Sequence, residues 1–408
     1  MNNSENLQIF KLENQIQNYA WGSKTFIPEL LGKATTSQET QAELWMGSHL
    51  KASSKVTMNC RKKSLRDIIL SNPEEMLGEK ISRQFNSNLP FLFKVLAAGS
   101  PLSIQVHPNK TQAEEGFKLE NEKEIPLGSS KRNYKDDNHK PELICALTNF
   151  ELMCGFQPIK DIVDMIKYLQ LDEILVRSKE LELDMKAYNL QKMFSNLMSK
   201  QGVEQNKVVN KLRKKITELQ PRDEKERLIF KWIKTLVSSY PNDMGVFSPL
   251  FLNVIKLEPG DALFLDAGVL HSYLDGCGIE IMANSDNVLR GGLTPKNIDL
   301  PELLKVLKFD VEKLRKIQPE IIKNEIVYRT PAQEFQLSKI VVHNNKPFIN
   351  KKITSPEIML CTSGSGKISW KDSVLEIKKG ESIFIPFSIS EYMFEGTMEL
   401  FRAVVPMK

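Results

Sequence analysis

The histidines of this chain gather in segments whose residue types suit chemistry. Four of the five, His49, His107, His139 and His271, lie in polar or glycine-rich stretches, and only His343 does not. A lone histidine is more often structural than a ligand, but several of them in such contexts indicate a site. We assign no role to His343.

The densest polar stretch spans residues 260–296. It contains His271 just after a turn, Glu280 nine residues further on, the run Asn-Ser-Asp-Asn at 284–287, and then Arg290. An imidazole and carboxylates beside a fixed guanidinium could bind a metal, transfer protons and hold an anion. These properties suit an enzyme site better than a core strand.

Two other segments contain residues that could share a metal ion with His271. Gln105 and His107 lie two residues apart in a predicted strand, so their side chains point to the same face. Glu142 follows a turn that a proline constrains. Two imidazoles, one carboxylate and one amide oxygen suit Zn²⁺ and leave room for water or a substrate. We predict one zinc ion bound by these four residues, and His139 is an alternative to any one of them.

The elements that must position these residues are mostly short strands. Runs rich in β-forming residues occur at 42–46, 55–58, 91–96, 102–107, 252–257 and 262–265. Within the first 150 residues we expect only one or two short helices, beginning after Ser64 and at Pro73.

Residues 158–245 differ in character from both flanks. Apolar residues recur there at helical spacing, as in Ile162, Ile166 and Leu169, until the sequence Tyr240-Pro241. We expect four or five helices in an all-helical module that packs beside the site or covers it.

An internal repeat links the two β-rich regions. Residues 254–265 align without gaps with residues 374–385, at an offset of 120 residues. Eleven residues after the glycine of each turn, the first copy has His271 and the second has Glu391. We infer two copies of one jelly-roll half-motif, of which only the first keeps the histidine. The alternative is a chance match of two strand–turn–strand units.

Composition narrows the class of protein. The 408 residues, 41% hydrophobic and 26% charged, predict two or three globular domains. The net charge of +5 falls mostly between Lys160 and Asp243, where 17 basic residues mix with 13 acidic ones, so we expect no nucleic-acid partner. No apolar run suits a membrane span, and the first residues lack a signal-peptide pattern. Five scattered cysteines without a CxxC pair favour a cytoplasmic protein without disulfides.

Five segments together resemble those of the type I phosphomannose isomerases, the zinc-dependent cupin class of mannose-6-phosphate isomerases. They are QNYAWGS at 17–23, AELWMG at 42–47, PLSIQVHPNK at 101–110, NYKDDNHKPE at 133–142, and the stretch 260–296. The resemblance covers nearly the whole chain and is weakest in the helical module. Where the family usually has Pro-His-Ala-Tyr and Arg-Ala-Gly, this chain has Leu270-His-Ser-Tyr and Arg290-Gly-Gly. Neither departure removes a polar group.

The resemblance implies a mainly β fold with an α-helical insert. A cupin (jelly-roll) catalytic domain would occupy 1–157 and 246–318, with the helical domain at 158–245. A second, degenerate cupin-like β domain would occupy 319–408.

The resemblance also implies an activity, the reversible isomerisation of mannose 6-phosphate and fructose 6-phosphate through an enediol. By resemblance, zinc is bound by Gln105, His107, Glu142 and His271, and Arg290 is the essential active-site arginine. The expected partner is a small sugar phosphate. The oligomeric state stays open, and a monomer is compatible with the sequence.

Isomerisation of this kind needs a base near two adjacent carbons and positive charge where an oxyanion develops. Arg290 is our first choice for the fixed cation, and its alternative is a structural ion pair. The base candidates are Lys140, Asp286, Glu280 and His139. Burial would have to raise the pKa of Glu280 for it to act as a base, and Glu280 could instead support a turn or a histidine.

A phosphate dianion needs several hydrogen-bond donors. The residues that we expect to supply them are Ser103, Lys94, Lys110 and Lys296. Those that we expect to form walls of the pocket are Trp21, Glu43, Trp45 and His49. Lys94 could instead be an edge-strand lysine, and the tryptophans could belong to the core.

Two other functions fit part of the pattern. An iron dioxygenase of the cupin class would use two histidines and one carboxylate, but Gln105 as a fourth ligand and the basic residues disfavour it. A non-catalytic sugar-phosphate-binding module could dispense with Arg290, Asp286 and Glu280. Because all three are present, we favour catalysis.

Overall fold

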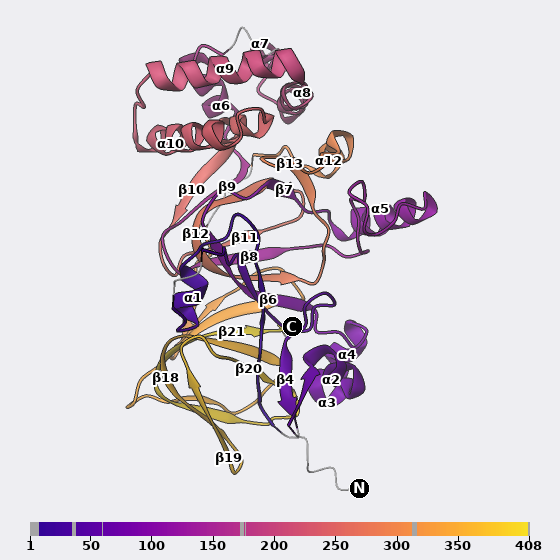
Figure 1. Ribbon diagram of the computed structural model, residues 1–408, viewed down its shortest axis with the longest axis vertical. Helices are drawn as coiled ribbons and strands as arrows, with labels where there is room; N and C mark the ends of the chain where they lie inside the picture. Colours follow the sequence, from indigo (N-terminus) through magenta and orange to yellow (C-terminus); the bar gives the residue numbers. More distant parts are fainter. Residues whose placement is uncertain are drawn as a thin grey trace.

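The structure is a computed structural model that describes residues 8–34, 38–58, 60–171, 175, 177–311 and 316–406. The molecule is elongated, with an all-helical module at one end and a β domain formed largely by the C-terminal part of the chain at the other (Figure 1). Between them lies the sheet that carries the predicted site residues. Among the helices of the described ranges, none combines the length and the apolar character that crossing a bilayer requires.

The central sheet has ten antiparallel strands in the described part of the chain. They are β2 (Gln15–Gln17), β3 (Glu43–Met46), β6 (Phe91–Ala98), β7 (Ile104–Val106), β8 (Glu142–Ala146), β9 (Phe150–Phe156), β10 (Leu252–Leu257), β11 (Ala262–Leu265), β12 (His271–Ala283) and β13 (Leu289–Gly292). The expected strands around the site are therefore present.

Strand β12 organises this sheet. Its first residues pair with β7 and β9, and its later residues pair with β6 and β8. The pairing with β9 has a register irregularity between Tyr273 and Asp275, close to where the partner strands change. Because successive side chains alternate, Glu280 points away from its neighbours Ile279 and Ile281, which lie in a core shared with the C-terminal β domain. One strand thus supplies both a packing face and a polar face.

The C-terminal β domain is built on a nine-stranded sheet in the described residues. Its strands are β1 (Phe10–Lys11), β14 (Glu320–Ile322), β15 (Glu325–Tyr328), β16 (Gln336–Val342), β17 (Phe348–Asn350), β18 (Glu357–Trp370), β19 (Ser373–Lys378), β20 (Ser382–Ile385) and β21 (Tyr392–Val404). Strand β1 comes from the N-terminal part of the chain, so this sheet is not formed by one continuous segment.

The two β regions repeat the same arrangement. Strands β19 and β20, joined by a short turn, precede the 13-residue strand β21, just as β10 and β11 precede the 13-residue strand β12. Both of these turns contain a glycine with positive φ, 92° at Gly260 and 86° at Gly380. Glu391, the counterpart of His271, is exposed. The geometry agrees with the predicted repeat and with the loss of the histidine from the second copy.

The described part of the helical module contains five helices. They are α6 (Ile159–Tyr168), α7 (Ser178–Leu183), α8 (Ala187–Met198), α9 (Gly202–Glu218) and α10 (Glu224–Ser239). Their apolar residues share one core with Ile104 of β7, Met153 of β9 and Leu289 of β13. The module therefore packs directly on the strands that carry Gln105 and Arg290.

The first 157 residues contain more helix than we expected. Helices α2 (Leu65–Ser71) and α3 (Pro73–Leu77) begin where predicted. Three others were missed, namely α1 (Phe26–Leu30), α4 (Glu79–Gln84) and α5 (Lys110–Glu122). Helix α5 buries only Ala113, Gly116 and Glu120, so it lacks the apolar period that reveals a helix. Its capping box, in which Asn109 and Gln112 exchange hydrogen bonds, was the usable signal.

The remaining elements connect these layers. They are the two-stranded ribbon of β4 (Lys55–Met58) and β5 (Arg61–Ser64), the 3-10 helix η1 (Met244–Phe247), α11 (Ser248–Phe251) and α12 (Leu300–Val306). Pro301 lies in the first turn of α12, where a proline is tolerated.

Candidate metal centre and active-site cleft

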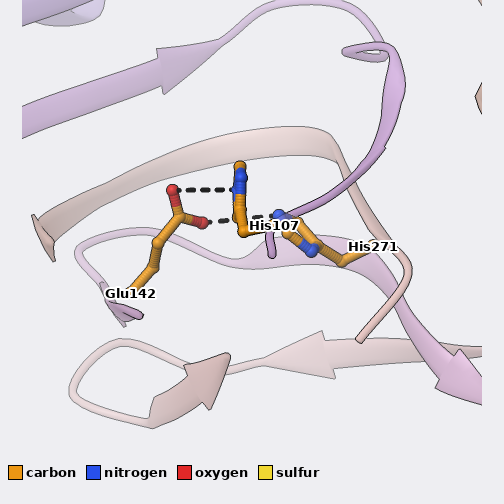
Figure 2. Close-up of side chains that lie close together, drawn as sticks. All are labelled: His107, Glu142 and His271. Atoms are coloured by element: carbon orange, nitrogen blue, oxygen red, sulfur yellow. Dashed lines mark ion pairs between the residues drawn. The ribbon is translucent and has the colours of Figure 1, made fainter. Parts of the chain in front are cut away.

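His107, Glu142 and His271 meet inside the central sheet (Figure 2). Nε2 of His107 lies 3.3 Å from Oε1 of Glu142, and Nε2 of His271 lies 3.4 Å from Oε2. All three side chains are buried. Within the described residues, the two Nε2 atoms and Oε2 have no hydrogen-bond partner. Buried polar atoms without partners are costly, so this arrangement suits a bound cation.

Both imidazoles are held in the tautomer that metal binding needs. Nδ1 of His107 donates to the carbonyl of Asn287 at 2.7 Å, and Nδ1 of His271 donates to the carbonyl of Val269 at 2.9 Å. A carbonyl only accepts, so each proton is on Nδ1 and each Nε2 lone pair faces Glu142. Burial, together with the nearby charge of Lys140, lowers the pKa of His107 to about 4. This ring is therefore neutral at neutral pH, as a ligand must be.

Gln105 lies next to this cluster. In the pairing of β7, it is opposite His271 on β12 and opposite Arg290 on β13. Its side chain also lines the cleft described below. This position is compatible with the fourth ligand expected from the sequence.

The cluster borders a cleft of about 600 Å³. Thirteen residues singled out from the sequence line it: Trp21, Glu43, Trp45, His49, Lys94, Ser103, Gln105, Lys140, Glu142, Glu280, Asp286, Arg290 and Lys296. Pairing with β12 explains much of this convergence, because Lys94 is opposite Glu280 and Glu142 is opposite Met282.

Lys94 belongs to a buried network of charges. Its Nζ lies 2.5 Å from Oε2 of Glu280 and 3.3 Å from Oε1 of Glu43. Trp45 donates to Glu43 and the Tyr273 hydroxyl donates to Glu280, both at 2.7 Å. Burial by itself would lower the pKa of Lys94, but the two carboxylates outweigh it and raise the pKa. Burial raises the pKa of Glu280 despite the opposing charge of Lys94.

Asp286 lines the cleft between two basic side chains. Its Oδ2 lies 2.7 Å from Nζ of Lys51, and its Oδ1 lies 3.8 Å from Nε2 of His49. Burial opposes ionisation, but Lys51 and His49 lower the pKa of Asp286 below its usual value. The carboxylate is therefore ionised at neutral pH, which is the state that a base requires.

Three cations of the cleft lack a carboxylate partner. Arg290, Lys135 and Lys296 all line it, and no ion pair joins them to an acidic residue in the described ranges. Burial and the charge of Lys51 lower the pKa of Lys135, and Arg290 and Lys296 add to this effect. Burial and Arg290 likewise lower the pKa of Lys296. An uncompensated positive cluster of this kind attracts an anion.

Two of the predicted site residues lie outside both the cleft and the metal-ligand cluster. His139 and Lys110 line an adjoining cavity of about 840 Å³ instead. Nε2 of His139 lies 2.7 Å from Oε1 of Glu334 in the C-terminal β domain. Lys110 donates to the carbonyl of Asp137 at 2.8 Å.

Four residues that sequence reasoning did not select also belong to the site. Lys51 and Lys135 line the cleft, Tyr273 bonds to Glu280, and Asn287 bonds to His107. Lys135 lies within NYKDDNHKPE, and Tyr273 and Asn287 lie within residues 260–296, so membership of these motifs was a usable signal. Lys51 follows His49 by two residues.

A jelly-roll sheet in which two histidines and one glutamate converge defines a metal-binding cupin protein. Over 395 residues, the chain is 42% identical to the mannose-6-phosphate isomerase of Salmonella typhimurium, covering 96% of this chain and 98% of that protein. The chain belongs to the type I phosphomannose isomerase family, as the sequence resemblance indicated.

Other comparisons agree. The family descriptions that match are the type I phosphomannose isomerase catalytic domain at residues 9–159, its helical insertion domain at 165–252, and the mannose-6-phosphate isomerase cupin domain at 324–405. The human mannose-6-phosphate isomerase is 34% identical over 416 residues, with 96% of this chain and 94% of that protein covered. A crystal structure of zinc-bound mannose 6-phosphate isomerase has a TM-score of 0.90 at 40% identity and covers 98% of this chain and 100% of that chain. The predicted fold class is confirmed.

Proposed function

We propose that this chain catalyses the reversible isomerisation of mannose 6-phosphate and fructose 6-phosphate with one bound zinc ion. The observation that carries the proposal is a buried pair of imidazoles and a carboxylate beside a cleft lined by cations. In the described residues, both Nε2 atoms and Oε2 of the carboxylate lack a hydrogen-bond partner, and three of the cations lack an ion pair. The family supports the same reaction, since relatives 34% and 42% identical are named mannose-6-phosphate isomerase.

His107, Glu142 and His271 would hold the zinc ion, with Gln105 as the fourth ligand. The donor set of two neutral imidazoles, one carboxylate and one amide oxygen suits Zn²⁺. When bound, zinc would supply positive charge that stabilises negative charge developing on a substrate oxygen. The side chains of the cleft would perform the proton transfer and hold the substrate.

The reaction moves a proton between two adjacent carbons, so it needs a base that reaches the cleft. Among the candidates Lys140, Asp286, Glu280 and His139, we favour the first two. Nζ of Lys140 lies 3.1 Å from Oε1 of Glu142, next to the zinc ligands. Asp286 is an ionised carboxylate on the cleft wall. Glu280 is less available because Lys94 and Tyr273 already engage it.

The phosphate group would bind the unpaired cations Arg290, Lys296 and Lys135, with Ser103 as a further donor. A dianion there would compensate charges that repel one another. Arg290 could also face the developing oxyanion, because it is opposite Gln105 on β7. Lys94 and Lys110 are weaker choices, since one is neutralised by two carboxylates and the other bonds a backbone carbonyl.

The cellular location, the oligomeric state and the domain bounds belong to the same proposal. We propose a cytoplasmic location, because all five cysteines are free thiols and four are buried. A monomer would be sufficient for catalysis, since one chain supplies every group assigned above. The domain plan of 1–157 with 246–318, 158–245 and 319–408 is compatible with α6 beginning at Ile159.

A coupled isomerase assay on mannose 6-phosphate tests the proposal. Purified protein should turn over the substrate, lose activity after treatment with a chelator, and regain it when zinc is added back. The control is the parent protein carried through the same chelation and dialysis with zinc present throughout. Absence of turnover in fully zinc-loaded, folded protein would disprove the proposal. Bound iron with oxygen uptake would favour a dioxygenase instead.

A further inference from the structure

Two loops carry both of the favoured base candidates of the proposed site. One loop precedes β8 and carries Lys135 and Lys140. The other joins β12 to β13 and carries Asp286. The two loops are far apart in the sequence, so contacts between them decide whether their side chains share one cleft.

The side chain of Asn287 joins these loops. Its Oδ1 accepts from the backbone N–H groups of Lys135 and Asp136 at 2.7 and 3.2 Å. Its Nδ2 donates to the carbonyls of Asp136 and Asn138 at 2.8 and 2.9 Å, and to Oδ1 of Asp136 at 3.2 Å. Asn287 has 0% relative exposure. All the donors and acceptors of its amide are thus used in one contact between the loops.

Asp136 supports the same contact from the other side. Its Oδ1 accepts from the hydroxyl of Ser285, and its Oδ2 accepts from the backbone N–H of Asp286, both at 2.7 Å. The backbone of Asp286 is therefore held by the loop that also carries Lys140. Removal of either Asn287 or Asp136 would free the two proposed base candidates to move relative to each other.

The backbone of Asn287 has a second contact. Its carbonyl accepts from Nδ1 of His107 at 2.7 Å, and this bond directs Nε2 of His107 toward Glu142. A carbonyl bonded to the second nitrogen of a ligating histidine fixes the ring and its tautomer. Asn287 therefore orients a zinc-ligand candidate through its backbone and holds the two loops together through its side chain.

We infer that Asn287 is a positioning residue for the proposed zinc site and for Asp286. Its side-chain amide fixes the 284–288 loop against residues 135–138. The backbone carbonyl of Asn287 is thereby kept within hydrogen-bonding distance of Nδ1 of His107. This inference rests on the proposed function. Loss of the hydrogen-bond partner of a metal-bound histidine typically lowers metal affinity or activity by about 10–100-fold, and we expect a loss in this range for Asn287→Ala.

The experiment measures zinc affinity directly, by competition with a chromophoric chelator, and compares it with stability and turnover. The variants are Asn287→Ala, Asn287→Asp, which keeps the size but replaces the two donors with an acceptor, and Asn189→Ala. Asn189 is a buried asparagine of the helical module, and its amide bonds to Asp184. Both residues are distant in sequence from the segments that line the cleft. The Asn189 variant should lose stability without losing zinc affinity.

We expect both Asn287 variants to bind zinc about 10–100-fold more weakly and to lose kcat more than KM changes. If Asn287→Ala does not fold, Asp136→Asn, which removes an acceptor from the same contact, should show the same loss of zinc affinity. Zinc affinity and kcat within twofold of the parent in a folded Asn287 variant would overturn the inference. If the Asn287 variants bind zinc more weakly than a parent protein that itself has no isomerase activity, the inference about Asn287 is upheld and the proposed function is disproved.

Discussion

Lys94 and Glu280 are opposite each other on β6 and β12, and the Lys94 ammonium lies 2.5 Å from the Glu280 carboxylate in the protein interior. Burying either charge alone would cost free energy, and the attraction between the two charges offsets part of that cost. The pair also fixes Tyr273 and Glu43 through the bonds that they form with it. It thereby sets the shape of the cleft wall next to the zinc-ligand candidates.

Single changes to this pair should destabilise the protein more than the double change. Lys94→Met and Glu280→Gln should each lower the free energy of unfolding by about 3–5 kcal/mol, because each leaves a buried charge without its nearest opposite charge. The double variant should lose less than the sum. Urea unfolding of all four proteins measures this, and strict additivity would contradict it. As a control, Arg329→Met removes an ion pair with Glu320 that is about half exposed and should cost about 1 kcal/mol or less.

The stability of the metal-free protein should depend on pH through His107. Its pKa is about 4 in the folded chain and 6.5 ordinarily, so between these values only the unfolded state binds the proton. The stability from this residue is therefore complete above pH 6.5 and is lost as pH falls toward 4, by up to ~3 kcal/mol. Burial also lowers the pKa of His49, so parent and His107→Gln must be compared. Urea unfolding from pH 7 to pH 4.5 should show a smaller decrease for the variant, and equal slopes would contradict the argument.

Arg290→Ala should lose most of the rate while keeping zinc and fold. Removal of one fixed group that stabilises transition-state charge typically costs about 10²–10³ in kcat. Zinc content by atomic absorption and the melting temperature should stay close to the parent values, because Arg290 has no ion pair in the described residues. Arg213→Ala, on the exposed face of α9, is the matched control. Near-normal turnover of Arg290→Ala would remove its catalytic role.

Lys135→Met should weaken substrate binding. We expect KM for mannose 6-phosphate to rise about tenfold and inhibition by inorganic phosphate to weaken in proportion, because one donor to a dianion is lost. Lys225→Met, which removes an exposed cation of the helical module, should change neither value. If phosphate inhibits Lys135→Met as strongly as it inhibits the parent, Lys135 lies outside the phosphate site.

His139→Ala and Glu334→Ala should lower kcat/KM to the same small extent. If the 2.7 Å contact only holds the loop of Lys140 against the C-terminal β domain, each variant should lose less than about tenfold in kcat/KM, and the double variant should lose no more. A base role for His139 predicts the opposite pattern, a loss of about 10² or more in His139→Ala alone. Steady-state kinetics on the three variants separates the two roles.

Residue types and local spacing indicated His107, Glu142 and His271, which the fold brings together, and a helical insert between β-rich segments. The two-residue spacing of Gln105 and His107 places both on one strand face, and helical periodicity identified the insert, because both patterns depend only on neighbours in the chain. Helix α5 escaped because its sequence has little apolar period.

The partners of each charged group depended on strand register and loop contacts, which no local pattern encodes. Consecutive residues His139 and Lys140 line different cavities, and Lys94 is neutralised by carboxylates from two other strands. Arg290, Lys135 and Lys296 come from separate segments and remain unpaired in the described part of the cleft. Electrostatic energy depends on distance in space, so the sequence identified the chemical groups and the folded chain determined which of them act on one another.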